Sequence, residues 1–168
     1  MLSDPFALTI LAAGGGTAAV IDLRTRRVPN ALTMSLAGAG MVLAATGLGR
    51  IEVMAALVGG LLGALLMLPG HVLGATGAGD VKLLGAAGTL LGPPLTLQAF
   101  LIAMIAGGAL ALMVAARRGR LRLTIARSVE LIETAGGNAS EIEDPQADSR
   151  FAYAPAIAVG AIVAGTLA

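Results

Sequence analysis

Apolar residues are gathered into six runs, and all but the fourth and fifth, which adjoin each other, are separated by polar or glycine-rich stretches. The runs cover residues 6–21, 31–48, 51–68, 83–95, 96–116 and 151–168. A helix rises about 1.5 Å per residue, so roughly 20 apolar residues are enough to cross a hydrocarbon core of about 30 Å. The pattern therefore predicts an all-α fold, a single polytopic membrane domain with six transmembrane helices. The run 83–95 reaches only about 20 Å, so we expect its helix to begin inside protein or to include preceding residues.

The composition agrees with a protein that resides in a bilayer. Hydrophobic residues make up 57% of the 168 residues, charged residues only 12%, and the mean hydropathy is +0.88, which excludes a water-soluble domain. Among the 24 glycines, Gly59 and Gly63 stand at helical spacing, which predicts close packing between helices. Because there is no cysteine, disulfides, thiolate metal sites and a cysteine nucleophile are excluded.

The basic residues indicate which ends of the spans face the cytoplasm. If six spans alternate in direction, ten of the 11 lysines and arginines fall on one side, and only Arg50 falls on the other. Cytoplasmic loops are enriched in these residues, so that side is predicted to be cytoplasmic, with both termini outside. The first run follows Met1 to Pro5, which carry no basic residue, so we expect a retained span rather than a signal peptide. The ten residues are Arg24, Arg26, Arg27, Lys82, Arg117, Arg118, Arg120, Arg122, Arg127 and Arg150.

Residues 117–150 differ in composition from the runs around them. From 117 to 134, apolar residues recur at helical spacing between arginines, which is typical of a helix that lies on anionic lipid or continues the fifth span. A surface that docks a substrate is the alternative for this cytoplasmic amphipathic segment. Residues 135–149 form a polar, acidic stretch, which predicts a loop, and we assign no chemistry to it.

Acidic residues inside or at the edge of apolar spans need a reason because ionised carboxylates are costly there, and we single out two, which the six-span topology places at the same cytoplasmic end. They are Asp22, at the end of the first run, and Asp80, just before the fourth. Two carboxyl groups brought together cannot both ionise easily, so they would share one proton, the state that a water-activating acid/base pair requires. The alternative is a pair of helix-end carboxylates that are solvated or paired with Arg24 and Lys82.

Glycines surround the second aspartate. Gly77 and Gly79 permit backbone angles and close approaches that other residues resist, so an extended substrate would be able to lie beside Asp80. Near the first aspartate, Pro29 and Asn30 end a loop and start the second run, and we expect Asn30 to cap that helix. Lys82 has two interpretations, an electrostatic neighbour of Asp80 or a snorkelling lysine at the inner edge.

Three stretches resemble the type IV prepilin peptidases, membrane aspartyl proteases with a Gly-x-Gly-Asp motif, and in particular the minimal form that serves Flp-type (tight-adherence) pili. Asp22 is followed by Val-Pro-Asn at 28–30, where the family more often has Ile-Pro-Asn. Residues 77–82, Gly-Ala-Gly-Asp-Val-Lys, match the second aspartate's motif without departure. Residues 151–157, Phe-Ala-Tyr-Ala-Pro-Ala-Ile, resemble the start of the family's last span. The resemblance covers nearly the whole chain except about residues 117–150.

This resemblance implies an aspartic endopeptidase that removes the leader peptides of prepilins at the cytoplasmic face of the bacterial inner membrane. Asp22 and Asp80 would be the catalytic pair, with Gly77, Gly79 and Lys82 helping to position the substrate, together with Pro29 and Asn30. The implied partners are a helical prepilin with a basic leader and the lipid bilayer. No metal, cofactor or nucleic acid is expected.

One activity of larger relatives is not expected in this chain. Those relatives add a cytoplasmic domain with paired Cys-x-x-Cys motifs and also methylate the new amino terminus of the pilin. Here cysteine is absent and only Met1 to Pro5 precede the first run. N-methyltransferase activity is therefore not expected.

Other functions fit the sequence less well. An intramembrane serine protease needs a serine and a histidine within spans, but Ser35 is the sole serine inside a span and His71, the only histidine, is expected in an inner loop. No His-Glu-x-x-His helix is present to bind zinc. Two alternatives stay open. One is a small proton- or cation-coupled transporter that uses the aspartate pair, and the other is a catalytically silent protein of pilus assembly.

Overall fold

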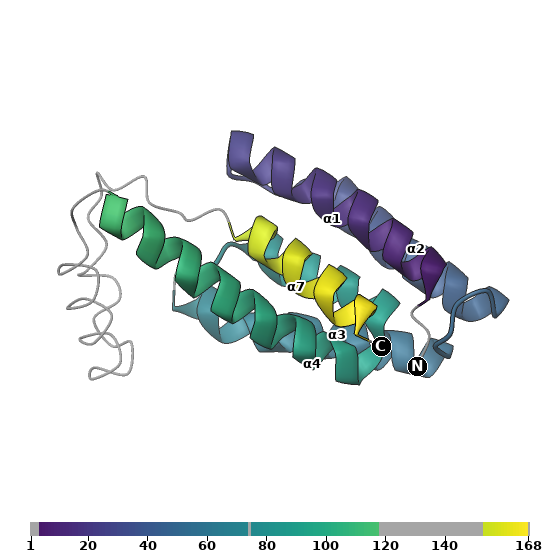
Figure 1. Cartoon of the computed structure of the whole chain (residues 1–168). Coiled ribbons are helices and arrows are strands. Elements are labelled where there is room, and N and C mark those ends of the chain that lie inside the picture. Colours follow the sequence, from purple (N-terminus) through teal and green to yellow (C-terminus); the bar gives the residue numbers. More distant parts are fainter. Residues whose placement is uncertain (1–3, 74, 118–152, 168) are drawn as a thin grey trace.

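The computed structural model describes residues 4–73, 75–117 and 153–167, and in these residues it confirms the all-α class (Figure 1). The helices are α1 (Pro5–Thr25), α2 (Asn30–Thr46), α3 (Val53–Val72), α4 (Ala78–Arg117) and α7 (Ala154–Thr166). The amphipathic and acidic stretches expected between 118 and 150 lie outside the described residues. Observed helix ends differ from the predicted ends by a few residues, except within α4.

The helices are those of a membrane protein. Three of them contain stretches long and apolar enough to cross a bilayer, Pro5–Thr25, Val53–Val72 and Ala78–Met113, and α2 and α7 are shorter apolar helices. Large apolar side chains face outward, where lipid would cover them, with Ile105 73% and Met34 72% exposed. A water-soluble protein of this size would not expose so much apolar surface. The six separate spans stay a prediction, because five helices are described rather than six.

The break between the predicted fourth and fifth spans lies at Gly92, a few residues before the predicted boundary at about Leu95. Gly92 has φ 70° and ψ 172°, a conformation outside the helical region that glycine adopts without strain, and it divides α4 into two helical segments. Pro93 and Pro94 follow, as expected at the start of a helix, where a missing N–H costs nothing. The first segment begins at Ala78 rather than Leu83, so the short span does include preceding residues.

The first segment of α4 is the centre of the bundle. Every residue from Leu83 to Leu91 is buried. Glycines let it approach α3 closely. Gly59 packs directly on the carbonyl of Gly88, and a Cβ added to Gly63 would lie 2.5 Å from the carbonyl oxygen of Leu84. The predicted packing role of Gly59 and Gly63 is thereby confirmed.

The second segment of α4 returns along α7. Gly160 of α7 packs on Ala99 and Ala103, and Tyr153, directly before α7, packs on Gly107. Figure 1 shows this part of α4, in green, running beside the yellow α7. The chain therefore reverses direction at Gly92, and the two ends of α4 lie at the same end of the bundle.

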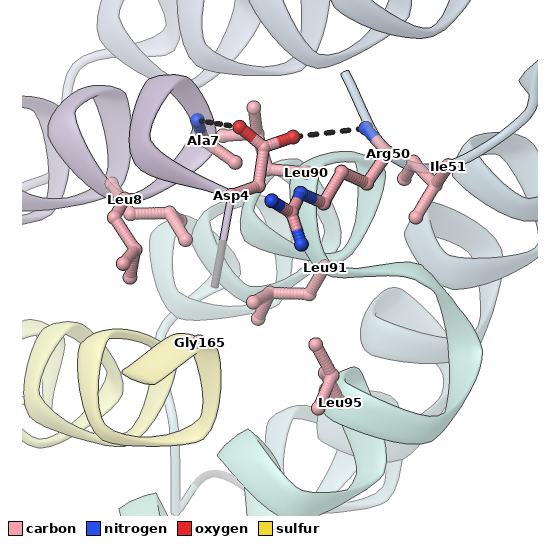
Figure 2. Close-up of a pocket in the computed structure, with 10 residues that line it drawn as sticks. Asp4, Ala7, Leu8, Arg50, Ile51, Leu90, Leu91, Leu95 and Gly165 are labelled. Atoms are coloured by element: carbon pink, nitrogen blue, oxygen red, sulfur yellow. Dashed lines mark hydrogen bonds between the residues drawn. The ribbon is translucent and has the colours of Figure 1, made fainter. Parts of the chain in front are cut away.

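At the opposite end of the bundle, Asp4 links the start of α1 to the loop between α2 and α3. Its Oδ1 accepts hydrogen bonds from the backbone N–H groups of Phe6 (3.0 Å) and Ala7 (3.2 Å), which caps α1, and its Oδ2 accepts from Arg50 N at 2.9 Å (Figure 2). A small pocket beside this contact is lined mainly by apolar side chains, including Leu90. The pocket contains neither Asp22 nor Asp80, which lie at the other end.

Candidate active site

Asp22 lies in the last full turn of α1 and is held by the start of α7. Its side chain is buried, with 6% exposed, and its Oδ2 accepts a hydrogen bond from the backbone N–H of Ala154 at 3.2 Å. Ala154 is the first residue of α7, so this N–H is one of those that a helix leaves without an internal partner. Arg26, in the left-handed conformation (φ 53°), ends α1 with a bond from its N–H to the Asp22 carbonyl at 2.7 Å. The carboxylate thus links two helices far apart in the sequence.

Asp80 is held by the start of its own helix. Its Oδ2 accepts from the backbone N–H of Gly77 at 3.0 Å, while its own N–H donates to the Gly77 carbonyl at 3.0 Å. This is the side-chain half of a capping box, in which an acidic residue in the first turn reaches back to the residue before the helix. Asp80 is also 6% exposed. The Gly-x-x-Asp spacing therefore fixes a buried carboxylate at a helix N-terminus, whose dipole favours negative charge.

The structure brings these two carboxylates together. Asp22 and Asp80 are close enough for their charges to interact, and the charge of Asp80 also reaches the phenol of Tyr153. The pair is assembled from α1 and α4, with α7 supplying the N–H that holds Asp22. Two buried carboxylates within electrostatic reach form a suitable acid/base pair, because one is readily kept protonated beside the other.

The loop before α2 meets the first turn of α4 beside this pair. A Cβ added to Gly79 would lie 3.1 Å from Cβ of Val28, so Val28 occupies the space in front of this glycine. Among the described residues, positive φ angles occur at Arg26, Gly47 and Gly92 only, so of the two properties that glycine permits at Gly77 and Gly79, a positive φ is not used and a close approach is found at Gly79. The close approach at Gly79 is to the chain's own Val28.

The sequence model of the type IV leader peptidase family matches residues 9–112. The chain belongs to this family. The match includes both aspartates, the Val-Pro-Asn of 28–30 and residues 77–82, and it ends before residues 151–157. A search of curated proteins and a search of solved structures each gave no match.

Asn30 and Lys82, both predicted to help position the substrate, contact each other in the structure. Asn30 does not cap α2, because Pro29 is the N-cap and α2 begins at Asn30 without a side-chain cap bond. Instead Asn30 Oδ1 accepts a hydrogen bond from Lys82 Nζ at 2.9 Å, joining the start of α2 to α4. Within the described residues Lys82 forms no ion pair with Asp80. Lys82 is therefore an interhelical link.

Two other residues lie where the sequence did not predict them. His71 lies in the last turn of α3, not in a loop, and its Nδ1 is 3.2 Å from the Thr76 carbonyl oxygen. Tyr153 was noticed only as part of a motif, and nothing in its local sequence shows that it lies beside the aspartates. In the described parts of the chain, no group of three or more histidine, aspartate or glutamate side chains is arranged to hold a metal ion.

Proposed function

We propose that this protein is an aspartic endopeptidase that removes the leader peptides of type IV, Flp-like prepilins. One observation carries the proposal, the buried pair of Asp22 and Asp80 within electrostatic reach of each other, inside the part of the chain that matches the family. Each carboxylate accepts a hydrogen bond from an N–H at the start of a helix, so each is oriented before any substrate arrives.

The pair would hydrolyse a peptide bond in two steps. The ionised carboxylate takes a proton from water, and the oxygen attacks the scissile carbonyl carbon while the protonated carboxyl gives its proton to the carbonyl oxygen. The tetrahedral intermediate then collapses, the C–N bond breaks, and the leaving nitrogen receives the proton taken from water. The proton on the carbonyl oxygen returns to the other carboxyl, which restores the pair.

A six-span arrangement would put this chemistry at the cytoplasmic face of the inner membrane. The apolar part of α4, at 36 residues, is about twice the length that one crossing needs, and Gly92 divides it. Among the described basic residues, only Arg50 lies at the far end of the bundle. The others are at the aspartate end, which supports a cytoplasmic site with both termini outside. They are Arg24, Arg26, Arg27, Lys82 and Arg117.

The position of the pair also suits the proposed substrate. Asp22 lies near the end of α1 and Asp80 in the first turn of α4, so the carboxylates are near the surface of the bilayer rather than at its centre. A prepilin has its polar, basic leader in water and its apolar helix in lipid. The bond between these two parts would therefore reach the same depth as the aspartates.

Co-expression with small prepilins from the same genome tests the proposal. We expect the wild-type protein to shorten a prepilin by its leader, as measured by mass spectrometry, and Asp80→Asn to leave the prepilin intact. Asp4→Asn is a matched control, since Asp4 is at the opposite end and asparagine caps helices as well as aspartate does. The same spectra show whether the new amino terminus is methylated, and we expect it to be unmethylated. Intact prepilin with the wild-type protein would favour a silent assembly protein.

A further inference from the structure

The second segment of α4 holds the aromatic ring that precedes α7. A Cβ added to Gly107 would lie 2.5 Å from Cζ, 2.6 Å from Oη and 2.8 Å from Cε2 of Tyr153, so the hydroxyl end of the ring lies against the glycine backbone. The Tyr153 hydroxyl donates to Sδ of Met104 at 3.4 Å, one turn earlier on the same helix. No side chain larger than hydrogen fits at position 107 while the ring stays in place.

This ring is directly connected to the donor that holds Asp22. Tyr153 is the N-cap residue of α7, and its carbonyl accepts the first helical bond, from Ile157 N at 3.1 Å. The next residue, Ala154, donates its N–H to Asp22 Oδ2. The ring on Gly107 and the N–H on Asp22 therefore belong to consecutive residues, so a displacement of the Tyr153 backbone would move this N–H relative to the carboxylate.

The phenol also lies within the electrostatic reach of Asp80. Tyr153 thus contacts the second segment of α4 on one side and is within the electrostatic reach of the catalytic end of the first segment on the other.

We propose that Tyr153 is a positioning residue for Asp22 and that Gly107 provides the surface on which its ring packs. The ring, packed on Gly107, fixes the start of α7, and the start of α7 fixes the Asp22 carboxylate through Ala154 N–H. The effect on catalysis rests on the proposed function, but the effect on the Asp22 carboxyl does not. This contact also gives α7, which lies beyond the part matched by the family, a role in the site.

Two neighbouring glycines provide the test. The methyl group of Gly107→Ala would overlap the ring of Tyr153, whereas the methyl group of Gly108→Ala meets no atom within 4 Å. Both variants make the same change in helix propensity. We expect Gly107→Ala and Tyr153→Ala to lower kcat for leader removal by about tenfold or more with little change in KM, because a small misplacement of a catalytic group is costly. Gly108→Ala should be unaffected, and Tyr153→Phe, which keeps the ring, should recover most of the loss seen with Tyr153→Ala.

The double variant Gly107→Ala/Tyr153→Ala separates positioning from general damage. Once the ring is gone, the added methyl group has nothing to displace. The double variant should therefore be no worse than Tyr153→Ala alone, a non-additive result expected only of residues in contact. Additive losses would show that Gly107 and Tyr153 act independently and would overturn the proposal.

A second measurement does not depend on cleavage. Dicyclohexylcarbodiimide reacts with protonated carboxyl groups in membranes, and mass spectrometry of the Asp22 peptide gives the pH midpoint of labelling. An N–H donor favours the ionised form, so we expect the midpoint to move to higher pH in Gly107→Ala and Tyr153→Ala and to stay unchanged in Gly108→Ala. A shifted midpoint in a protein that cleaves no prepilin would support the positioning role and refute the proposed function. An unshifted midpoint in Gly107→Ala, with cleavage by the wild type, would refute the positioning role alone.

Discussion

Asp22 Oδ2 accepts a hydrogen bond from Ala154 N at 3.2 Å, although the two residues are 132 positions apart in the sequence. Asp80 has the equivalent partner close by, the N–H of Gly77. Both carboxylates are therefore oriented by N–H groups at helix starts, but one is held by local sequence and the other only by the completed fold. It follows that Asp80 is in place once α4 forms, whereas Asp22 also needs α7.

The first prediction concerns the two carboxyl groups. Asp22→Asn and Asp80→Asn should each lower the rate of leader removal by about 10²-fold or more, since an amide cannot exchange the protons that the mechanism needs. The amide oxygen can still accept from Ala154 or Gly77, so both variants should insert normally and keep their thermal stability in detergent. Near-normal processing by either variant would exclude the aspartyl mechanism.

The second prediction concerns Gly79. A Cβ here would lie 3.1 Å from Cβ of Val28, so Gly79→Val should force the start of α4 away from the loop before α2 and displace Asp80 with it. We expect a large loss of cleavage and a destabilisation of about 1–3 kcal/mol. Gly16→Val is the control, because a Cβ at Gly16 meets nothing within 4 Å. Equal losses in the two variants would mean that Val28 does not constrain this position.

Hydropathy alone predicted the helices but could not place the break in α4. The apolar pattern is continuous from Leu83 to Ala116, so it contains no signal of the reversal. The local signal is Gly92 followed by two prolines, the residues that suit a positive φ and the start of a helix. Turn chemistry, rather than periodicity, therefore marks the boundary.

The roles of Asn30 and Gly79 could not be predicted from the sequence, because they depend on contacts between residues far apart in the chain. Asn30 was predicted to cap α2, because capping depends only on neighbouring residues. Its side chain instead accepts a hydrogen bond from Lys82, 52 residues away. The motif glycines allowed either an unusual backbone angle or a close approach, and the structure shows a close approach of Gly79 to Val28, which only the fold brings near. Asp22 and Asp80 were identifiable because acidic residues in apolar surroundings stand out in the sequence itself.

The third prediction uses a buried hydroxyl beside the aspartate motif. Thr76 Oγ1 is buried and has no hydrogen-bond partner among the described residues, so Thr76→Val should leave the free energy of unfolding unchanged or raise it. Thr89→Val should instead cost about 1 kcal/mol, because Thr89 Oγ1 donates to the Ala86 carbonyl at 2.8 Å. Denaturation in mixed detergent micelles compares the two. A larger loss at Thr76 would indicate an ordered partner for that hydroxyl.

The fourth prediction concerns metals. The chain has one histidine and no cysteine, and zinc peptidases need several such ligands around an open site. Leader removal should therefore continue at the same rate after treatment with a chelator, measured beside a zinc protease in the same membranes as a positive control. Inhibition by the chelator that added zinc reverses would contradict the proposed chemistry.

The last prediction tests orientation. Because the chain has no cysteine, single cysteines can be labelled without background by a thiol reagent that does not cross membranes. Leu48→Cys, in the exposed loop at the Asp4 end, should be labelled in intact spheroplasts. Thr25→Cys and His71→Cys, both exposed at the aspartate end, should be labelled only after the membrane is opened. Labelling of all three in the reverse pattern would put the aspartates outside and exclude a cytoplasmic cut. If Thr25 and His71 were labelled from opposite sides, the carboxylates would be about 30 Å apart across the bilayer, and no shared catalytic chemistry would be possible.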